Sequence, residues 1–149
     1  MSEFTRGVYT ISTDAERLDI EVIHRFLTRS YWANGVPREI VVRSISNSLP
    51  FGIYRGESQV GFARVISDCA TFAYLADVFV LEEHRGVGLS KWLMEVIVSD
   101  PRLQGLRRWM LATADAHGLY GQYGFTALRQ PERWMELHRP MVYRQDDHS

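Results

Sequence analysis

Two glycines separated by one residue stand near the middle of the sequence, in the run EHRGVGLSKWL. An apolar strand-like pattern precedes Gly86 and Gly88, and an apolar helical pattern follows them. A glycine turn between a strand and a helix gathers unpaired backbone N–H groups at the positive end of the helix dipole, where anions and above all phosphates bind. Arg85 and Lys91 place two cations beside the same turn. The run therefore predicts a local phosphate-binding site.

Two widespread nucleotide-binding motifs fit this turn poorly. A Rossmann fingerprint needs a third glycine, and Lys91 stands at that position. A Walker P-loop needs a lysine followed by serine or threonine, whereas here Ser90 precedes Lys91. The phosphate must therefore belong to a ligand of another class.

A single carboxylate, Asp77, interrupts the apolar stretch YLADVFV just before the turn. A buried carboxylate is costly unless it is paired or functional. Asp77 could accept a proton or hold a positively charged group; alternatively it is a structural hydrogen-bond acceptor. In a regular strand Tyr74 would face away from Asp77. Glu82, Glu83 and His84 fit solvated loop positions.

The bulk composition limits the possible partners. A chain of 149 residues suggests one domain, and its net charge of −1 gives no support for a nucleic-acid or membrane partner. Cys69 is the lone cysteine, and the five histidines lack metal-ligand spacing, so no metal is expected. The first residues contain no apolar signal core, and no apolar run approaches the ~18 residues of a membrane span. We expect a cytoplasmic protein, either a monomer or a homodimer.

The hydrophobic patterns predict a mixed α/β (α+β) fold in the order β-α-α-β-β-β-α-β-α-β-β. The predicted strands are GVYTIS, the two strands of LPFGIYRGESQVGFARVIS, ATFAYLADVFVL, LRRWMLAT, FTAL and RWMELH. The predicted helices lie in STDAERLDIEVIHRFLTRS, in REIVVRSISNS, after the glycine turn and in DAHGLYGQYG. We expect a single domain over residues 1–143 and a C-terminal tail over 144–149.

Three stretches together resemble the GCN5-related N-acetyltransferase (GNAT) family. The turn from Arg85 to Ser90 is similar to that family's [QR]-x-x-G-x-[GAS] pattern, although Ser90 replaces the more frequent glycine or alanine. LADVFV resembles the family's fourth strand, and GLYGQYGF resembles its LYxxxGF element, with Tyr120, Gly124 and Phe125 on the signature positions. The element order is also the family's. The resemblance covers essentially the whole chain, and it is most specific from Asp77 to Phe125.

This resemblance implies a GNAT fold, with a central twisted mixed sheet of about seven strands flanked by about four helices. It further implies an N-acetyltransferase that binds acetyl-CoA or coenzyme A as cosubstrate, with no metal. The acetyl group would pass from the thioester to a primary amine by direct attack in a ternary complex. The cofactor-binding residues implied are Val78, Phe79, Val80, Arg85, Gly86, Val87, Gly88, Leu89, Ser90, Lys91 and Tyr120.

The resemblance also implies that Tyr120 is the catalytic acid. A phenol with a pKa of about 10 stays protonated where a thiol with a pKa of about 8.5 does not, so it can protonate a departing thiolate. Tyr123 stands at a family position that is usually not catalytic. Asp77 is the candidate base, because an alkyl amine is mostly protonated at neutral pH and must lose a proton before it attacks. The alternative for Tyr120 is a packing role at the edge of the core.

The acceptor pocket is expected between the first two helices and their loop. Candidate lining residues are Tyr31, Trp32, Arg43, Ser44, Asn47 and Tyr74, with Trp134 and Met135 closing the other side. We expect a small-molecule amine in preference to a protein. A protein N-terminus or lysine stays open as acceptor, as does a non-catalytic module that binds acyl-CoA and regulates another process.

Overall fold

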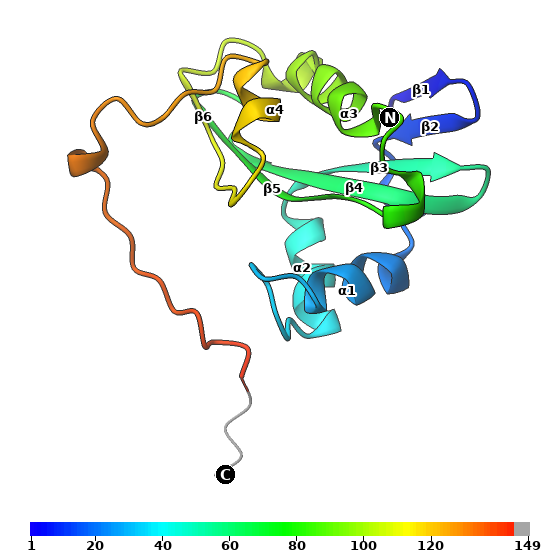
Figure 1. Cartoon of the computed structure of the whole chain (residues 1–149), viewed down its shortest axis with the longest axis horizontal. Coiled ribbons are helices and arrows are strands. Elements are labelled where there is room, and N and C mark those ends of the chain that lie inside the picture. The colour runs from blue at the N-terminus through cyan, green and yellow to red at the C-terminus, as the bar shows by residue number, and fades with distance from the viewer. Residues whose placement is uncertain (145–149) are drawn as a thin grey trace.

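A mixed sheet of six strands forms the middle layer of the computed structural model, which describes residues 1–144 (Figure 1). The strands follow one another in space as they do in sequence, and all neighbours are antiparallel except β5 and β6, which are parallel. Their bounds are β1 (Glu3–Arg6), β2 (Tyr9–Ser12), β3 (Leu49–Arg55), β4 (Ser58–Ser67), β5 (Phe72–Val80) and β6 (Arg108–Met110). The predicted tail lies outside the described residues from position 145 onward.

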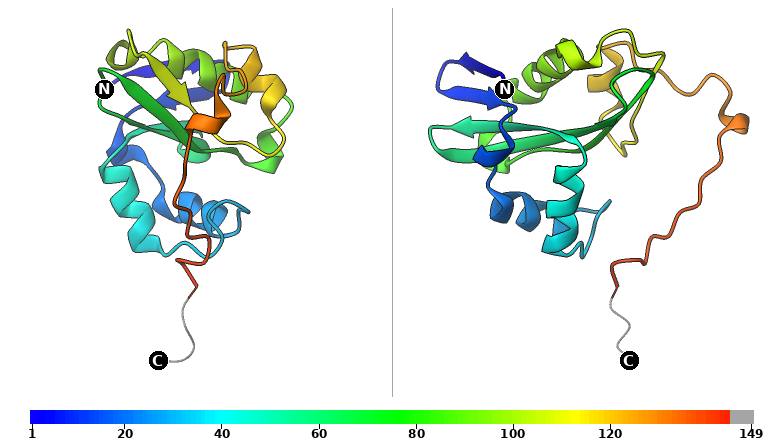
Figure 2. Two further views of the ribbon diagram at one scale, coloured as in Figure 1. Left: turned by 90° about the vertical axis from the view of Figure 1, so that its left-hand side faces the viewer. Right: turned by 180° about the vertical axis from the view of Figure 1, so that it is seen from behind.

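Helices cover both faces of this sheet (Figures 1 and 2). One face carries α1 (Ile20–Thr28) and α2 (Arg38–Ser46), and the other carries α3 (Leu89–Val98) and α4 (His117–Gly121). An apolar core fills each of the two interfaces. The predicted mixed α/β architecture with four helices is therefore confirmed.

The first helix begins where its sequence allows a cap. Asp19 is the N-cap of α1, and its carboxylate accepts from the backbone N–H groups of Glu21 and Val22. These are two of the donors that a helix start leaves without an internal partner. Ile23 and Leu27, one turn apart, are buried against the sheet, as the amphipathic pattern predicts.

Three strand predictions need correction. The N-terminal strand is a hairpin, because residues 3–6 form β1 and pair with β2. Neither FTAL nor RWMELH forms a strand; the chain after α4 is irregular apart from a short 3₁₀ helix at Pro131–Arg133. Within residues 1–144 these two segments have no strand beside them, and an isolated extended segment gains no ladder hydrogen bonds.

A β-bulge interrupts β5 at the carboxylate that the sequence singles out. The β4–β5 pairing moves from Phe62 opposite Phe79 to Arg64 opposite Ala76, so β5 holds one residue more than β4 over this stretch. Asp77 has a φ of 56°, the left-handed conformation that an extra residue in a bulge adopts. Aspartate tolerates this conformation better than most residues other than glycine.

The bulge reverses the alternation of side chains along β5. Ala73 and Leu75 belong to the core under α3, whereas Phe79 belongs to the core under α1 and α2. In a regular strand these three odd-numbered residues would share one face. Tyr74 lies between Ala73 and Leu75 and so points to the α1–α2 face, where Asp77 also lies. The prediction that Tyr74 and Asp77 face opposite sides is therefore wrong.

The strands β5 and β6 pair over a short length and then part. Their parallel register runs only from Phe72 opposite Arg108 to Tyr74 opposite Met110. Beyond Tyr74 no described strand lies along that edge of β5, so Val78 to Val80 have no strand partner on the β6 side. The sheet thus opens along the second half of β5, before the chain enters the glycine turn.

Candidate active site

The glycine turn at the end of β5 adopts a conformation that requires glycine. Gly86 and Gly88 have φ angles of 84° and 83°, in a region that costs other residues about 1–2 kcal/mol. A Cβ built on either glycine meets no heavy atom within 4 Å. Close packing within the protein is therefore not the reason for these glycines. Their side of the turn faces open space, from which a ligand can approach the backbone.

The same turn presents a row of unsatisfied donors. The backbone N–H groups of residues 86 to 91 have no acceptor among residues 1–144. Gly88 is the N-cap of α3 and supplies no capping side chain, and the first turn of α3 contains no acidic residue. Lys91 instead adds a positive charge where the helix dipole is already positive. An anion bound here would satisfy the donors and balance both charges.

His84 and Arg85 directly precede the glycine turn in the sequence. The Arg85 Nε donates to the carbonyl oxygen of Val80 at 2.9 Å, which fixes the side chain against the end of β5. The His84 Nδ1 lies 3.0 Å from the hydroxyl of Tyr9, which comes from β2. A small pocket of about 140 Å³ is lined by Val80, His84, Arg85, Gly86, Gly88, Leu89, Ser90 and Lys91. The sequence suggested a solvated loop position for His84. The contact with Tyr9 could not be predicted, because it depends on how β2 lies beside the turn.

Asp77 is paired rather than isolated. The Arg64 Nε donates to one carboxylate oxygen at 2.6 Å, and the Trp32 Nε1 donates to the other at 2.8 Å. The side chains of Asp77 and Arg64 are only 11% and 17% exposed, so this charge pair is largely withdrawn from water. Arg64 was not predicted as a site residue. Its place opposite Ala76 in the register brings it to Asp77.

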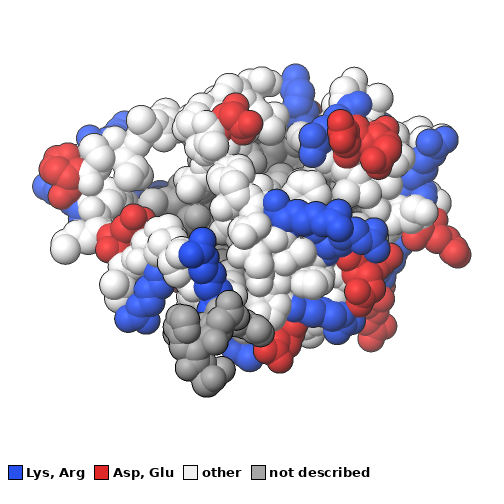
Figure 3. All heavy atoms as spheres, turned by 60° about the horizontal axis from the view of Figure 1, so that its bottom comes forward, with Lys and Arg blue, Asp and Glu red and all other residues white. Residues whose placement is uncertain are grey.

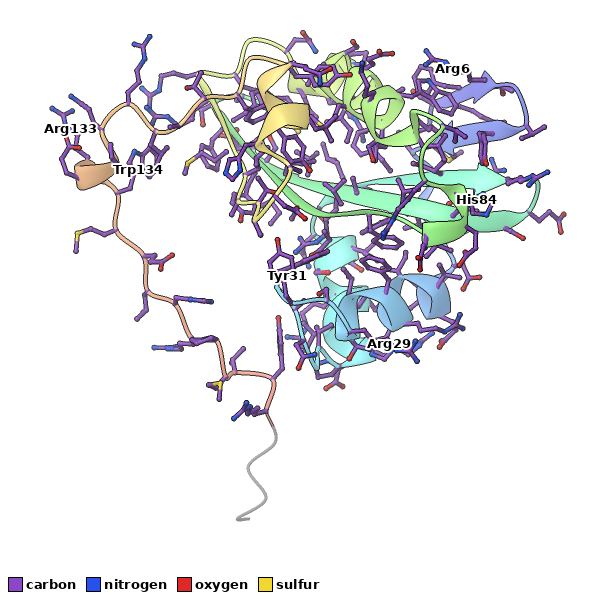
Figure 4. All side chains as sticks on the ribbon, in the orientation of Figure 1. Arg6, Arg29, Tyr31, His84, Arg133 and Trp134 are labelled. Atoms are coloured by element: carbon purple, nitrogen blue, oxygen red, sulfur yellow. The ribbon has the colours of Figure 1, made fainter. Side chains whose placement is uncertain are left out.

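Aromatic rings cover the face of the sheet beside Asp77. Phe26 of α1 stacks on Phe79 with ring centroids 4.1 Å apart. Trp32 lies 6.1 Å from Phe26, and Tyr31 meets Trp32 edge-on at 5.1 Å. The Tyr31 hydroxyl accepts from the backbone N–H of Ala114 at 3.1 Å. Tyr31 therefore crosses from the α1–α2 loop to the segment between β6 and α4 (Figure 4).

Tyr120 lies close to this crossing. Its side chain comes from α4, is 8% exposed, and meets the ring of Phe125 edge-on at 6.0 Å. Burial raises the pKa of the Tyr120 phenol above its ordinary value, and the neighbouring Tyr31 and Asp115 raise it further. The phenol oxygen has no hydrogen-bond partner among residues 1–144. Tyr120 therefore combines a buried ring with a protonated hydroxyl that donates to no residue among 1–144.

Tyr123 has a different place, although it lies on the same short segment. Its hydroxyl donates to the backbone carbonyl oxygen of Lys91 at 2.9 Å. This bond ties the end of α4 to the first turn of α3. Tyr123 thus serves the packing of the two helices, and its hydroxyl is not available in the way that the Tyr120 hydroxyl is.

Several predicted acceptor residues do not join the Asp77 cluster. On α2, the Ser44 hydroxyl donates to the carbonyl oxygen of Val41, and the Asn47 amide donates to that of Arg43. These side chains serve their own helix, and Arg43 is exposed. Trp134 lies far from Tyr31 (Figure 4), with the Arg108 guanidinium 4.8 Å from its ring centroid. The prediction that Trp134 closes the acceptor pocket is not supported.

Within residues 1–144 no group of three or more histidine, cysteine or acidic side chains could hold a metal ion. None of the described helices is long and apolar enough to cross a membrane. Positive and negative side chains are interspersed on the face that Figure 3 shows.

Comparison with known proteins agrees with this geometry. Residues 46–127 match the acetyltransferase (GNAT) domain. A Gibberella zeae protein whose name places it among the acetyltransferases is 34% identical over 142 residues, covering 80% of this chain and 79% of that protein. A GNAT-family crystal structure from Xanthomonas campestris pv. campestris is 54% identical with a TM-score of 0.90, covering 92% of this chain and 97% of that one. A Clostridium acetobutylicum protein crystallised with acetyl-CoA shares the fold, with a TM-score of 0.63 at 15% identity, covering 87% of this chain and 94% of that one. The chain belongs to the GNAT acetyltransferase family.

Proposed function

We propose that this protein is an N-acetyltransferase that moves an acetyl group from acetyl-CoA to a primary amine of a small molecule. The row of unsatisfied N–H groups at residues 86 to 91, at the start of α3, carries this proposal. The Clostridium acetobutylicum protein of the same fold holds acetyl-CoA, which supports the choice of ligand. The exposed free thiol of Cys69 suits a reducing compartment such as the cytoplasm.

The residues present fit coenzyme A in two places. The pyrophosphate suits the donors of residues 86 to 91, with Arg85 and Lys91 as cations and the Ser90 hydroxyl as a further donor. The edge of β5 from Val78 to Val80 has no strand beside it and offers backbone groups to the pantetheine arm, although the Val80 carbonyl oxygen already accepts from the Arg85 Nε. An arm that adds to this edge would run from the turn toward Tyr120.

Tyr120 is proposed to supply a proton in the acyl transfer. Acetyl-CoA supplies a thioester; the new C–N bond forms as the C–S bond breaks, and the departing sulfur takes a proton. Because burial raises the pKa of the Tyr120 phenol, the hydroxyl keeps its proton at neutral pH. Its unused donor is free to point at the sulfur.

Asp77 is proposed to orient the acceptor amine and to receive its proton, directly or through a water. Arg64 and Trp32 fix the carboxylate from two sides, and each of its oxygens keeps a further lone pair. Because Arg64 already balances the carboxylate charge, orientation of the amine is the larger part of this role. The aromatic rings of Tyr31 and Trp32 would enclose the acceptor beside it.

The test is a panel of amines assayed for release of free thiol from acetyl-CoA. The panel contains small primary amines, polyamines, amino acids and peptides, and Tyr120→Phe protein serves as the matched control for uncatalysed hydrolysis. Turnover with a small amine supports the proposal. Turnover with peptides alone would move the acceptor to a protein N-terminus or lysine. Binding of acetyl-CoA without turnover of any acceptor would favour the non-catalytic module.

A further inference from the structure

The C-terminal segment after α4 forms an arm that leaves the body of the molecule (Figures 1 and 2). We define the arm as residues 131–144. Near its start, Trp134 packs on Arg108 of β6. Near its end, Tyr143 packs against the core under α1 and α2 and lies beside Gly35. The arm is thus attached to its own chain at two distant points, and the residues between them span the distance.

The middle of the arm exposes large apolar side chains. Met135 is 97% exposed and Leu137 is 82% exposed, and Met141 and Val142 follow at 52% and 64%. Met135 and Leu137 alternate with Glu136 and His138, which is the pattern of a strand with one apolar face. Contiguous exposed apolar residues on a soluble protein indicate a contact surface.

An open groove lies beside the sheet edge from which the arm departs. It has a volume of about 1060 Å³ and runs between residues 107–110 at β6 and residues 123–130, and Arg133 and Trp134 at the start of the arm also line it. β6 pairs with β5 on one side only. Residues 126–130 make only local backbone hydrogen bonds within the described chain, such as that from Arg133 N–H to Gln130. Two unpaired stretches of backbone therefore face the groove, and unpaired edges readily accept a further strand.

The charges in this groove are of one sign. Its lining contains Arg107, Arg108, Arg129 and Arg133 and no acidic residue. None of these arginines forms a salt bridge with a carboxylate of residues 1–144. A strand that fits the groove should therefore bring apolar side chains on one face and a carboxylate on the other. The arm has this composition, with Met135, Leu137 and Glu136.

We propose that two copies of this chain exchange their arms: Trp134 stays on Arg108 of its own chain, and residues 135–139 of each copy insert as a strand between β6 and residues 125–130 of the other. The attachment of Tyr143 at the α1–α2 loop holds the middle of the arm away from the groove of its own chain. A second copy supplies the same segment without that constraint. Because each copy gives one arm and receives one, the contact closes on itself as a two-fold dimer. The predicted strand RWMELH would then form on its partner.

The oligomeric state of the full chain tests this proposal. Light scattering after size exclusion should give twice the 17.2 kDa mass of one chain. Leu137→Asp should raise the dimer dissociation constant about 10²-fold, because each dimer loses two buried leucines. The melting temperature of the isolated chain should not change, since Leu137 is exposed there. Val8→Asp is the matched control: Val8 is 61% exposed in the turn between β1 and β2, and its substitution should leave the dimer intact.

Cross-linking separates exchange from other ways of filling the groove. In a Cys69→Ser background, chains with Arg108→Cys are mixed with differently tagged chains that carry Glu136→Cys, and then oxidised. Exchange predicts a disulfide between the two kinds of chain, at a yield far above that of a control pair with Val8→Cys in place of Glu136→Cys. A monomeric mass for the wild type overturns the proposal. So does a disulfide that forms only when both cysteines are in one chain, or a dimer that Leu137→Asp leaves unchanged.

Discussion

Tyr120→Phe tests the proposed chemistry most directly. The substitution removes one oxygen atom and keeps the ring, which lies edge-on to Phe125. The hydroxyl makes no hydrogen bond within residues 1–144, so its loss should cost less than the ~1 kcal/mol of a typical hydrogen bond. The rate of acyl transfer should fall by about 10²–10⁴, the range of general acid–base help, which corresponds to about 3–5 kcal/mol of barrier.

The acid role of Tyr120 also predicts the direction in which the activity changes with pH. An acid must hold its proton, so activity that depends on Tyr120 is present below its pKa and is lost as pH rises through it. Burial raises that pKa above the usual value for tyrosine, so the loss should begin at a higher pH than a free phenol would give. The alkaline limb of the profile of kcat should vanish in Tyr120→Phe, which has no proton to lose.

The assay measures single-turnover release of coenzyme A thiol, with acetyl-CoA affinity measured separately by calorimetry. Affinity should change little, because the phosphate donors lie at residues 86 to 91. Tyr123→Phe is the control on the same segment: it removes the bond to Lys91, so it should lower stability by about 1 kcal/mol with only a small change in rate. Wild-type turnover in folded Tyr120→Phe protein would refute the acid role.

Three further substitutions separate binding, positioning and assembly. Gly88→Trp should weaken coenzyme A binding at least ~10-fold by calorimetry, because a side chain would occupy the approach to the turn. Gly56→Trp is the control, since Gly56 is another left-handed glycine at which an added Cβ meets no atom within 4 Å. It should lose as much free energy of unfolding as Gly88→Trp and keep full affinity for coenzyme A. Undiminished affinity in Gly88→Trp would remove the phosphate site from this turn. Asp77→Asn should lower kcat/KM for the amine about 10-fold or more and lower the free energy of unfolding by about 1–3 kcal/mol, with acetyl-CoA affinity unchanged. Normal turnover in the folded fraction would leave Asp77 a purely structural role. Leu137→Asp should halve the mass of the particle in light scattering, whereas a monomeric wild type would contradict the exchange of arms.

Local patterns predicted the elements of this fold well, and pairwise geometry was harder to predict. The strand–turn–helix around Gly86 and Gly88 was predictable because glycine spacing and helical periodicity are properties of neighbouring residues. The first helix was predicted to begin near Ser12, but α1 begins at Ile20 after Asp19, and Asp14 caps a short 3₁₀ helix before it. The pairing of Asp77 with Arg64 depends on the register of two strands, which the sequence of either strand alone does not contain. The same holds for the contact of Tyr9 with His84.

The failed prediction of the last two strands has a different cause. The alternation in RWMELH describes a segment that can form a strand, and a strand also needs a neighbour. The described chain provides none, because the arm is attached at Trp134 and at Tyr143 and passes outside the body between them. A strand pattern without a partner strand among residues 1–144 points to a partner strand in a second copy, which the proposed exchange of arms supplies.

The extra residue in β5 links the fold to the proposed chemistry. Without the bulge, Asp77 and Phe79 would follow Ala73 and Leu75 into the core under α3. With it, both side chains turn to the α1–α2 face, where Trp32 and Phe26 meet them. The bulge at Asp77 also lies only three residues after Tyr74, the last residue of β5 that pairs with β6. One inserted residue thus accompanies both the free strand edge that can accept the pantetheine arm and the carboxylate that can orient the amine, so deletion of that residue should abolish acetyl transfer even in a chain that folds.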